Sequence, residues 1–348
     1  MPSERVLLGH GSGGKLTHQL IEKLFLPPLS NAALRALDDS AVCSIGVARG
    51  KRGSGAKGGA RIAFTTDSYV VRPLFWPGGD IGRLAVCGTV NDLAMVGANP
   101  QYLSVAFILE EGFMLSTLRR VVRSMKRAVA EAKVKVVTGD TKVVERGAAD
   151  GLFINTAGVG LVPAGRSISG SNARPGDAVI LSGPIGNHGI SVLLEREQMG
   201  FAGTVKSDVA PLNHLVSAML AASPRIHALR DPTRGGLATT LVEIARQSGV
   251  AIRIYEDRVP IDEEVSAACE ILGYDPLYIA NEGKVIALVP ADDAPKVVDA
   301  MKKTAYGQRA VVIGEVLPEP GGRVLMKTRV GGTRVVDMLS GEQFPRIC

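Results

Sequence analysis

The sequence predicts an α+β protein with two domains and a C-terminal tail, and three observations support this. The chain has 348 residues, more than a single domain usually holds. Strand-like and helical stretches are interspersed through residues 1–165 and again through 170–338, with the linker "PAGRSISGSNARPGD" at the junction. Residues 339–348 have no hydrophobic period. We therefore expect one domain in each of the first two ranges and a mobile or loosely docked tail over the third.

The elements of the N-terminal domain follow from the spacing of apolar residues. A short strand-like segment at 5–8 precedes a helix whose leucines recur at helical spacing, and we expect this helix to end at Pro27 and Pro28. The later elements are a strand over 61–71 that runs into an acidic loop, a helix over 80–97, a strand over 102–109, a helix over 114–132, a strand over 134–141 that enters a loop, and a strand over 151–162.

The C-terminal domain is predicted from the same two periods. Its strands are expected at 178–183, 250–256 and 283–290, its helices near 188–199, 210–222, 233–248, 261–272 and 292–303, and strand-like alternation recurs around 309–317, 323–329 and 333–338.

Composition and charge exclude several classes of function. No apolar run approaches the ~20 residues that cross a bilayer, and no signal segment opens the chain, so we expect a cytoplasmic protein without a membrane partner. The net charge is +6, and residues 49–61 carry five positive charges and no acid. The remainder is nearly neutral, with no basic helix stripe and few aromatic residues, so we expect no nucleic-acid partner. We interpret 49–61 as a solvated insertion without a catalytic role.

The stretch "LLGHGSGGKLTHQL" (7–20) matches two phosphate-binding patterns, and neither interpretation holds. As a P-loop it lacks the hydroxyl that holds Mg²⁺, because Leu16 follows Lys15. As a dinucleotide fingerprint it lacks an acid at the end of the next strand, about 20 residues on. The glycines and Lys15 can still contact phosphate, although Lys15 alone is equally compatible with a surface lysine.

Aspartates at the ends of strand-like or helical segments offer a different metal–phosphate site. Mg²⁺ prefers hard oxygen ligands and usually bridges carboxylates to nucleotide phosphates. Each aspartate alone is more typical of a cap or turn, and spacing does not show that they converge. Lys142 and Glu282 are further candidates, and each can also be a simple turn or surface residue. The aspartates are Asp38, Asp39, Asp67, Asp92, Asp140 and Asp231.

Cys348 is the most distinctive residue of the tail. The four cysteines contain no C-x-x-C pair, which argues against a zinc finger or a thioredoxin-type motif. The other three lie in apolar contexts, whereas Cys348 ends "PRIC" in a segment without an apolar period. We expect Arg346 to favour the Cys348 thiolate and the chain-end carboxylate to oppose it, so the sequence does not predict the direction in which the pKa of the thiol is shifted. Ten residues from Leu339 extend roughly 30 Å, enough for the thiol to carry a group between an active site and a partner.

Taken together, these motifs resemble the hydrogenase-maturation carbamoyl dehydratases of the HypE type. The resemblance covers nearly the whole chain, in order, and rests on "LGHGSGGK", "TTDSYVVRPLFWPGGDIGRLAVCGTVNDLAM", "FILEEGF", "VTGDTKVV", "FINTAGVG", "RDPTRGGLA", "CEILGYDPLYIANEGK" and "PRIC". The family is related to the aminoimidazole ribonucleotide synthetases and selenophosphate synthetases. The resemblance implies their PurM-like two-domain ATP-binding fold: an N-terminal mixed sheet that dimerises, a C-terminal α/β sandwich domain and a flexible tail.

The resemblance also implies a reaction and its partners. A carbamoyltransferase would load a carbamoyl group onto Cys348, and ATP-dependent dehydration would convert this thiocarboxamide to an enzyme thiocyanate. The cyanide would then pass to iron on a scaffold complex, for [NiFe]-hydrogenase. The implied cofactors are ATP and Mg²⁺, and the ATP site lies where two N-terminal sheets meet, so a homodimer is implied.

The resemblance assigns roles position by position. Cys348 carries the group, and Glu282 and Lys142 are the candidate bases that act on it. The implied metal ligands are Asp39, Asp67, Asp92 and Asp231, and the implied nucleotide-binding residues are Gly11, Ser12, Gly13, Gly14, Lys15, Thr66, Asp67, Asn91, Gly139, Asp140 and Thr141. Asn187 stands in "GNHG" where the family often has Asp, and we assign its side chain no role.

Two alternatives stay open at this point. A selenophosphate or purine-type synthetase of the same superfamily is one, although a selenium enzyme would want a reactive cysteine where Ser12 and Gly13 stand. A non-catalytic scaffold that presents Cys348 is the other, although a scaffold has no need of the aspartate-rich loops.

Overall fold

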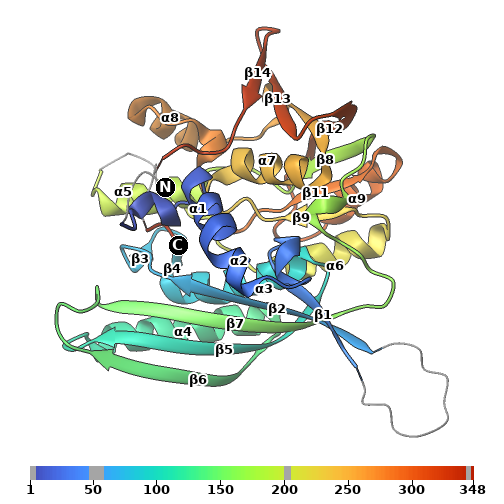
Figure 1. The fold of residues 1–348 in the computed structure, drawn as a ribbon. Coiled ribbons are helices and arrows are strands. Elements are labelled where there is room, and N and C mark those ends of the chain that lie inside the picture. Colours follow the sequence, from blue (N-terminus) through green and yellow to red (C-terminus); the bar gives the residue numbers. More distant parts are fainter. Residues whose placement is uncertain (1–4, 47–58, 200–204, 342–345) are drawn as a thin grey trace, which may run out of the picture.

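The computed structural model describes residues 5–46, 59–199, 205–341 and 346–348. The chain forms two main sheets with helices between and around them (Figure 1). The predicted α+β class with two domains is confirmed. No helix in these ranges combines the length and the apolarity needed to cross a membrane.

The first sheet has five strands in the order β1-β2-β7-β5-β6. All neighbours are antiparallel except β5 and β6, which are parallel. Its strands are β1 (Ala41–Ile45), β2 (Ala60–Tyr69), β5 (Asn99–Glu110), β6 (Lys135–Val144) and β7 (Leu152–Val162). The predicted strands over 61–71, 102–109 and 151–162 are present, and β1 is an additional strand.

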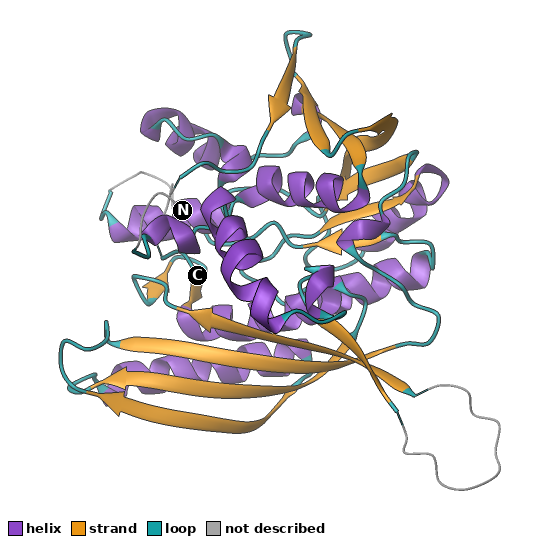
Figure 2. Cartoon of the chain, in the orientation of Figure 1, coloured by secondary structure: helices purple, strands orange, loops and turns teal. Residues whose placement is uncertain are grey.

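Helices α3 (Ile81–Met95) and α4 (Leu115–Ala132) cover one face of this sheet (Figure 2). Asp80 caps α3 by accepting hydrogen bonds from the N–H groups of Gly82 and Arg83, at 2.9 and 3.1 Å. The helix lies so close to β2 that a Cβ at Gly88 would sit 2.3 Å from the Tyr69 hydroxyl. This close packing sets the polar end of β2 beside α3.

The other face of the first sheet is open in the single chain. Register places Phe64 of β2 opposite Val159 of β7, and Val159 opposite Tyr102 of β5, so these three side chains share a face. Phe64 and Tyr102 are exposed, as are Ile108 and Leu161. An apolar sheet face without a cover indicates an interaction surface.

The second sheet has seven strands in the order β14-β13-β10-β12-β8-β11-β9. Its strands are β8 (Asp177–Leu181), β9 (Ala228–Arg230), β10 (Val250–Tyr255), β11 (Ile286–Pro290), β12 (Val311–Pro320), β13 (Arg323–Lys327) and β14 (Thr333–Val336). Alternate residues of β8 enter different cores: Val179 and Leu181 pack with α7 (Gly236–Ser248), whereas Ala178 and Ile180 pack with α6 (Asn213–Ala222) and α9 (Ala294–Lys302). Helices therefore cover both faces.

Shorter elements complete the chain. They are α1 (Lys15–Leu20), α2 (Leu26–Leu29), α5 (Asn187–Arg196), α8 (Glu263–Leu272) and the two-stranded sheet of β3 (Phe75–Trp76) and β4 (Gly79–Asp80). The three-residue strand β9 is too short to give a period and was not predicted.

Three predictions about local structure are wrong. Residues 5–8 form no strand, and a 3₁₀ turn occupies Leu8–Gly11. The first helix does not end at Pro27 and Pro28: a π-helical turn at Ile21–Phe25 leads into α2, whose first turn holds both prolines because their missing N–H groups need no partner there. The stretch "TGDT" is not a loop, since β6 continues through it to Val144. Most of the predicted insertion 49–61 lies outside the described residues, as does 342–345 of the predicted tail.

Candidate active site

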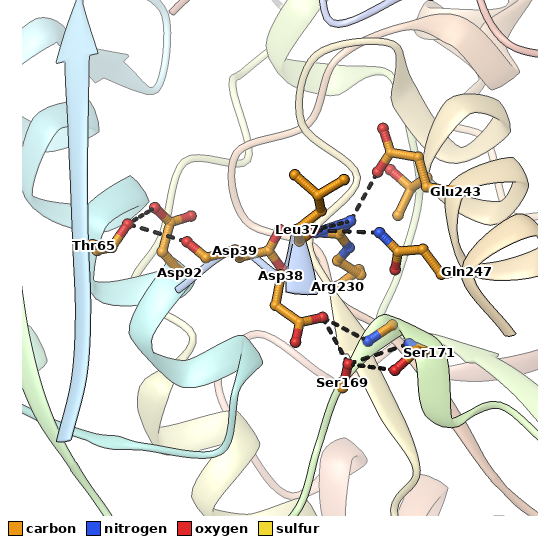
Figure 3. Close-up of polar contacts among 12 residues, drawn as sticks. Leu37, Asp38, Asp39, Thr65, Asp92, Ser169, Ser171, Arg230, Glu243 and Gln247 are labelled. Carbon is orange, nitrogen blue, oxygen red and sulfur yellow. Dashed lines mark hydrogen bonds and ion pairs between the residues drawn. The ribbon is translucent and has the colours of Figure 1, made fainter. Parts of the chain in front are cut away.

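Acidic side chains from both domains converge between the two sheets. Asp67 lies on the covered face of β2, and Asp92 lies on α3 beneath it. The Thr65 hydroxyl is 2.8 Å from Asp92 Oδ2 and 3.1 Å from the Asp39 carbonyl oxygen, which joins β2, α3 and the segment before β1 (Figure 3). Asp231 follows β9 of the second domain. The four aspartates that the resemblance implied as metal ligands thus share one region.

Burial and mutual repulsion together raise the pKa values of the carboxyl groups in this acidic cluster. Removal from water raises the pKa of Asp92 well above its usual range, and the charges of Asp231, Asp67 and Asp39 raise it further. The pKa of Asp231 is raised well above its usual range by burial and then by Asp39. Asp39 itself has a pKa of about 6, because burial outweighs the nearby Arg230.

Asp38 and Asp39 face different partners, which distinguishes two residues that the sequence does not. Asp38 Oδ1 accepts hydrogen bonds from Ser169 Oγ and the Gly170 N–H, at 3.0 and 2.8 Å. Asp39 Oδ1 lies 2.5 Å from Arg230 Nη1, and Arg230 Nη2 lies 3.1 Å from Glu243 (Figure 3). Asp38 therefore ties the two domains together, while Asp39 faces the cluster.

A cavity of about 660 Å³ opens beside the cluster. Its lining includes Gly13, Lys15, Asp39, Asp231 and Arg234, so it brings the glycine segment next to the acids. The Lys15 ammonium is 2.9 Å from an Asp337 carboxylate oxygen at the surface. The cavity is large enough for a small-molecule ligand.

The glycines of 11–14 allow the chain to pass very close to other backbone. Gly13 has a φ of +74°, and a Cβ there would lie 2.9 Å from the Arg234 carbonyl oxygen. A Cβ at Gly14 would lie 2.4 Å from the Leu339 carbonyl oxygen. The Ser12 hydroxyl bonds the carbonyl oxygens of Gly9 and Gly341, at 2.8 and 3.3 Å. The glycine segment therefore packs on the start of the tail.

The end of the tail lies beside Arg234, which also lines the cavity, and we call the region formed by the cavity, Arg234, Glu282 and the acidic cluster the cleft. Cys348 Sγ is 2.8 Å from Arg234 Nη2, and Arg234 also bonds the Gly11 carbonyl oxygen. Burial raises the pKa of the Cys348 thiol to about 11, with Arg234 opposing and Glu282 adding to the rise. The expectation that Arg346 acts on the thiolate is wrong, because Arg346 Nη1 instead lies 2.5 Å from Asp150.

Glu282 is a buried carboxyl close to the same thiol. It precedes β11, is 3% exposed, and its Oε1 has no hydrogen-bond partner among the described residues. Burial raises its pKa well above the usual range, and the charges of Asp231 and Asp67 add to this, while Arg234 lowers it. A carboxylate of raised pKa in a cleft can accept a proton near neutral pH.

Several of the implied site residues do not join this group. Lys142 lies on the edge strand β6, its ammonium 2.6 Å from Asp140. Register places Asp140 opposite Ala106 and Lys142 opposite Ile108, on the open face of the sheet, where Thr66 of β2 also lies. Gly139 and Thr141 belong to the same edge strand.

Asn91 is the other exception. It is fully buried, and its side-chain amide donates to the Ala210 and Glu282 carbonyl oxygens at 3.0 and 3.4 Å and accepts from the Leu212 N–H at 2.8 Å. It lies outside the cavity lining and joins α3 to the loops of the second domain.

Sequence reasoning missed Arg234, Arg230 and Glu243. Arg234 follows Asp231 in "RDPTRGG", where an arginine in a glycine-rich loop ahead of α7 was a usable signal. Arg230 and Glu243 were not detectable, because their pairing depends on β9 and α7 meeting in space.

The acidic cluster does not have the geometry of a formed metal site, but its oxygen atoms are ligands of the kind that a hard cation binds. Within the described ranges, no three His, Cys, Asp or Glu side chains are arranged to hold a metal ion. However, Asp39 Oδ2 and Ser40 Oγ are buried without a hydrogen-bond partner from those ranges. Oxygen donors that repel one another and lack partners fit Mg²⁺ with bound phosphate better than zinc.

The fold and this site define a class of protein. Residues 37–162 match the N-terminal domain family of AIR synthase related proteins, and residues 174–327 match the corresponding C-terminal domain family. The chain is therefore a two-domain AIR synthase related protein.

Comparison over the full length narrows the class. The carbamoyl dehydratase HypE of Cupriavidus necator is 52% identical over 346 residues, which cover 99% of this chain and 95% of that protein. A solved structure of the hydrogenase maturation protein HypE in complex with ATP superposes with a TM-score of 0.80 at 47% identity, covering 99% of this chain and 100% of the other. A HypE–HypF complex gives 0.84 at 47% identity, covering 92% and 99%. The chain belongs to the HypE carbamoyl dehydratase family.

Proposed function

We propose that this protein uses ATP to dehydrate a carbamoyl group carried on the Cys348 sulfur, giving an enzyme-bound thiocyanate for the cyanide ligand of [NiFe]-hydrogenase. The observation that carries the proposal is the position of Cys348 Sγ, 2.8 Å from Arg234 in the cleft that holds Glu282 and the acidic cluster. A relative of known structure binds ATP, which supports the energy source.

The reaction balances with ATP as the only co-substrate. The carboxamide oxygen attacks the γ-phosphorus, the bond to the ADP oxygen breaks, and ADP leaves. The carbon–oxygen bond then breaks, phosphate leaves with that oxygen, and the nitrogen gives up its protons as the C≡N bond forms. An amide oxygen is a very poor leaving group, and phosphorylation converts it into a good one.

Glu282 is the base that we assign to the carboxamide protons. Its carboxyl affects the pKa of Cys348, so the two groups lie close together, and its unpartnered Oε1 is available to accept a proton. Arg234 holds the sulfur and supplies a fixed positive charge beside the place where the carboxamide oxygen gains negative charge.

The nucleotide would occupy the 660 Å³ cavity, with its phosphates near Gly11–Gly14 and Lys15. Asp39, Asp67, Asp92 and Asp231 would hold Mg²⁺. Bound Mg²⁺ neutralises the phosphate oxygens and lowers the barrier to attack at phosphorus. These carboxylates repel one another in its absence, which supports the assignment.

Lys142 would act from a second copy of the chain. It lies opposite the exposed Ile108 on the open sheet face, the same face that carries Asp140, Thr66, Phe64 and Tyr102. A homodimer that pairs two such faces would cover the apolar surface and bring Gly139–Lys142 of one chain toward the cleft of the other.

Partner proteins would place the carbamoyl group on the Cys348 thiol and would accept the cyanide from it. A relative of known structure forms a complex with HypF, which supports a carbamoyltransferase as the loading partner. An iron-carrying scaffold complex would accept the cyanide.

Mass spectrometry of the intact protein tests the proposal. Cys348 is loaded with a carbamoyl group by potassium cyanate, and the protein is incubated with Mg·ATP. We expect the C-terminal peptide to lose the mass of one water while ATP is hydrolysed. A retained carbamoyl mass without ATP hydrolysis would refute the reaction. The control, Cys348→Ala, should bind ATP normally and acquire no modification on this peptide.

A further inference from the structure

The main-chain oxygens at the end of the tail are held by three side chains that were not among the predicted site residues. Each of its last three residues offers a main-chain oxygen to a different side chain: Arg196 Nη2 is 2.7 Å from the Arg346 oxygen, His188 Nε2 is 3.1 Å from the Ile347 oxygen, and Arg234 Nη2 is 3.3 Å from the Cys348 oxygen. We call His188, Arg196 and Arg234 the tail seat. Arg234 belongs to the cleft and Arg196 to the surface, whereas His188 is entirely inside the protein.

His188 is held in one orientation from behind. It is 0% exposed, and its Nδ1 lies 2.9 Å from Ser207 Oγ. The Trp76 ring meets the His188 ring edge-on, with 5.6 Å between the two ring centroids. Burial lowers the pKa of the imidazole, which keeps the ring neutral. A neutral ring that accepts from Ser207 at Nδ1 carries its proton on Nε2 and donates it to the Ile347 carbonyl.

Ile347 is held by its side chain as well as by its backbone. It is 3% exposed and packs in an apolar cluster with Ile190, Val205 and Ala280. The hydrogen bond between His188 and the Ile347 carbonyl is buried, and the loss of a hydrogen bond costs more there than at the surface.

The residue next to Ser207 connects the seat to Glu282. Asp208 Oδ1 accepts a hydrogen bond from the Glu282 N–H at 3.2 Å, and Lys284 lies 3.0 Å from Asp208 Oδ2. Adjacent residues of one loop thus hold the imidazole that meets the tail and the backbone of the candidate base.

We propose that His188 is a positioning residue, whose Nε2–H bond to the Ile347 carbonyl sets the depth at which Cys348 Sγ enters the cleft. This inference rests on the proposed dehydration, because depth matters only if Glu282 and the nucleotide must reach the group on that sulfur. Exact placement of a reacting group governs rate strongly.

Alkylation of Cys348 tests the seat without ATP or a carbamoyl group. The full-length protein is treated with iodoacetamide, and modification of the C-terminal peptide is followed by mass spectrometry. His188→Leu puts an apolar side chain of similar size in this buried position and removes the donor, so we expect Cys348 to be alkylated about 5- to 100-fold faster. His188→Gln can place an amide N–H near the position of Nε2, and we expect it to restore slow alkylation.

The matched control is His214→Leu. His214 Nε2 also lies 3.0 Å from a main-chain oxygen, that of Glu131, but at the surface and away from the tail. We expect its Cys348 alkylation to equal that of the wild type. Equal rates in His188→Leu and the wild type overturn the proposal. So does equal acceleration in His188→Gln and His188→Leu, which would assign His188 a packing role only.

Single-turnover dehydration separates this inference from the function on which it rests. At saturating ATP we expect His188→Leu to slow conversion of the carbamoylated tail by a similar factor, with an unchanged Kd for ATP. Faster alkylation with an unchanged dehydration rate overturns His188 as a positioning residue. If the wild type itself does not dehydrate its tail, the proposed function fails, while the alkylation series still decides whether His188 holds the tail.

Discussion

At the scale of single residues, Glu282 gives the sharpest test of the chemistry. Glu282→Gln keeps the size of the side chain and removes the proton acceptor, so we expect single-turnover dehydration to slow roughly 100- to 10,000-fold. In the wild type the rate should rise with pH through the raised pKa of Glu282, because only the ionised carboxylate accepts a proton. ATP binding should change little. A Gln variant with the wild-type rate and pH profile would exclude Glu282 as the base.

Replacing Asp92 should have opposite effects on the stability of the protein and on its binding of Mg·ATP. Its carboxyl stays protonated to a higher pH in the folded chain than in the unfolded one, so stability falls as the pH rises from the ordinary Asp range through the raised pKa. Asp92→Asn should therefore stabilise the nucleotide-free protein at neutral pH by about 1–3 kcal/mol and weaken Mg·ATP binding.

Thermal melts of Asp92→Asn and the wild type measure both effects. The two Tm values should converge near pH 4, and added Mg·ATP should raise the Tm of the wild type more than that of the variant. A less stable variant at neutral pH, with no ligand present, would contradict the raised pKa that burial and the neighbouring acids give Asp92.

The role of a single residue could be predicted only where the residues next to it in the sequence indicate that role. Cys348 is unusual wherever the tail lies, because nothing around it in the sequence suggests packing. Its partner Arg234 is more than 100 positions away, and the sequence pointed to Arg346 instead. Only three-dimensional contact separates Asp38, which bonds Ser169 and Gly170, from Asp39 beside it.

At the scale of elements, α3 and β2 make a contact that tolerates no added atom. Gly88→Ala would put a Cβ 2.3 Å from the buried Tyr69 hydroxyl, so we expect the free energy of unfolding to fall by about 1–3 kcal/mol. Helix propensity alone predicts the opposite sign, a gain of about 1 kcal/mol. Urea unfolding measures the difference, and Tyr69→Phe in the same chain should recover part of the loss. A stabilised Gly88→Ala variant would contradict the close packing.

Element boundaries were predicted well where the apolar period was long. They were predicted badly where strand pairing overrides the conformational preference of the residues. The helix at 115–132 has about five turns of clear period, and its prediction at 114–132 was almost complete. "TGDT" resembles a turn because Gly and Asp favour turns, yet β5 pairs with it residue for residue. A Cβ at Gly139 would lie 2.4 Å from the Val105 carbonyl oxygen, so that glycine serves close strand approach.

At the scale of the whole molecule, the two domains were predicted from the sequence, and the family resemblance implied that four aspartates share a site, but neither predicted how the sheets assemble. Sheet order and the covered face of the first sheet follow from pairing between distant segments, and no local period contains them. Lys142 shows why this sheet order matters for the site. Its place on the open face beside Ile108 separates it from the cleft that holds Glu282 in the same chain.

Subunit complementation tests whether Lys142 serves a second copy of the chain. Lys142→Ala and Glu282→Gln should each abolish most dehydration alone. In a homodimer with shared sites, a mixed dimer of the two variants contains one site with both residues intact and one site with neither. Unfolding and refolding the variants together should therefore restore about a quarter of the wild-type activity, because half of the dimers are mixed and half of their sites are complete.

The control mixture combines the Glu282→Gln variant with the double variant that carries both Glu282→Gln and Lys142→Ala. It contains no complete site and should stay inactive. A chain in which Lys142 acts on its own cleft would show no recovery in either mixture, and Lys142 would then be excluded as a base supplied by the partner.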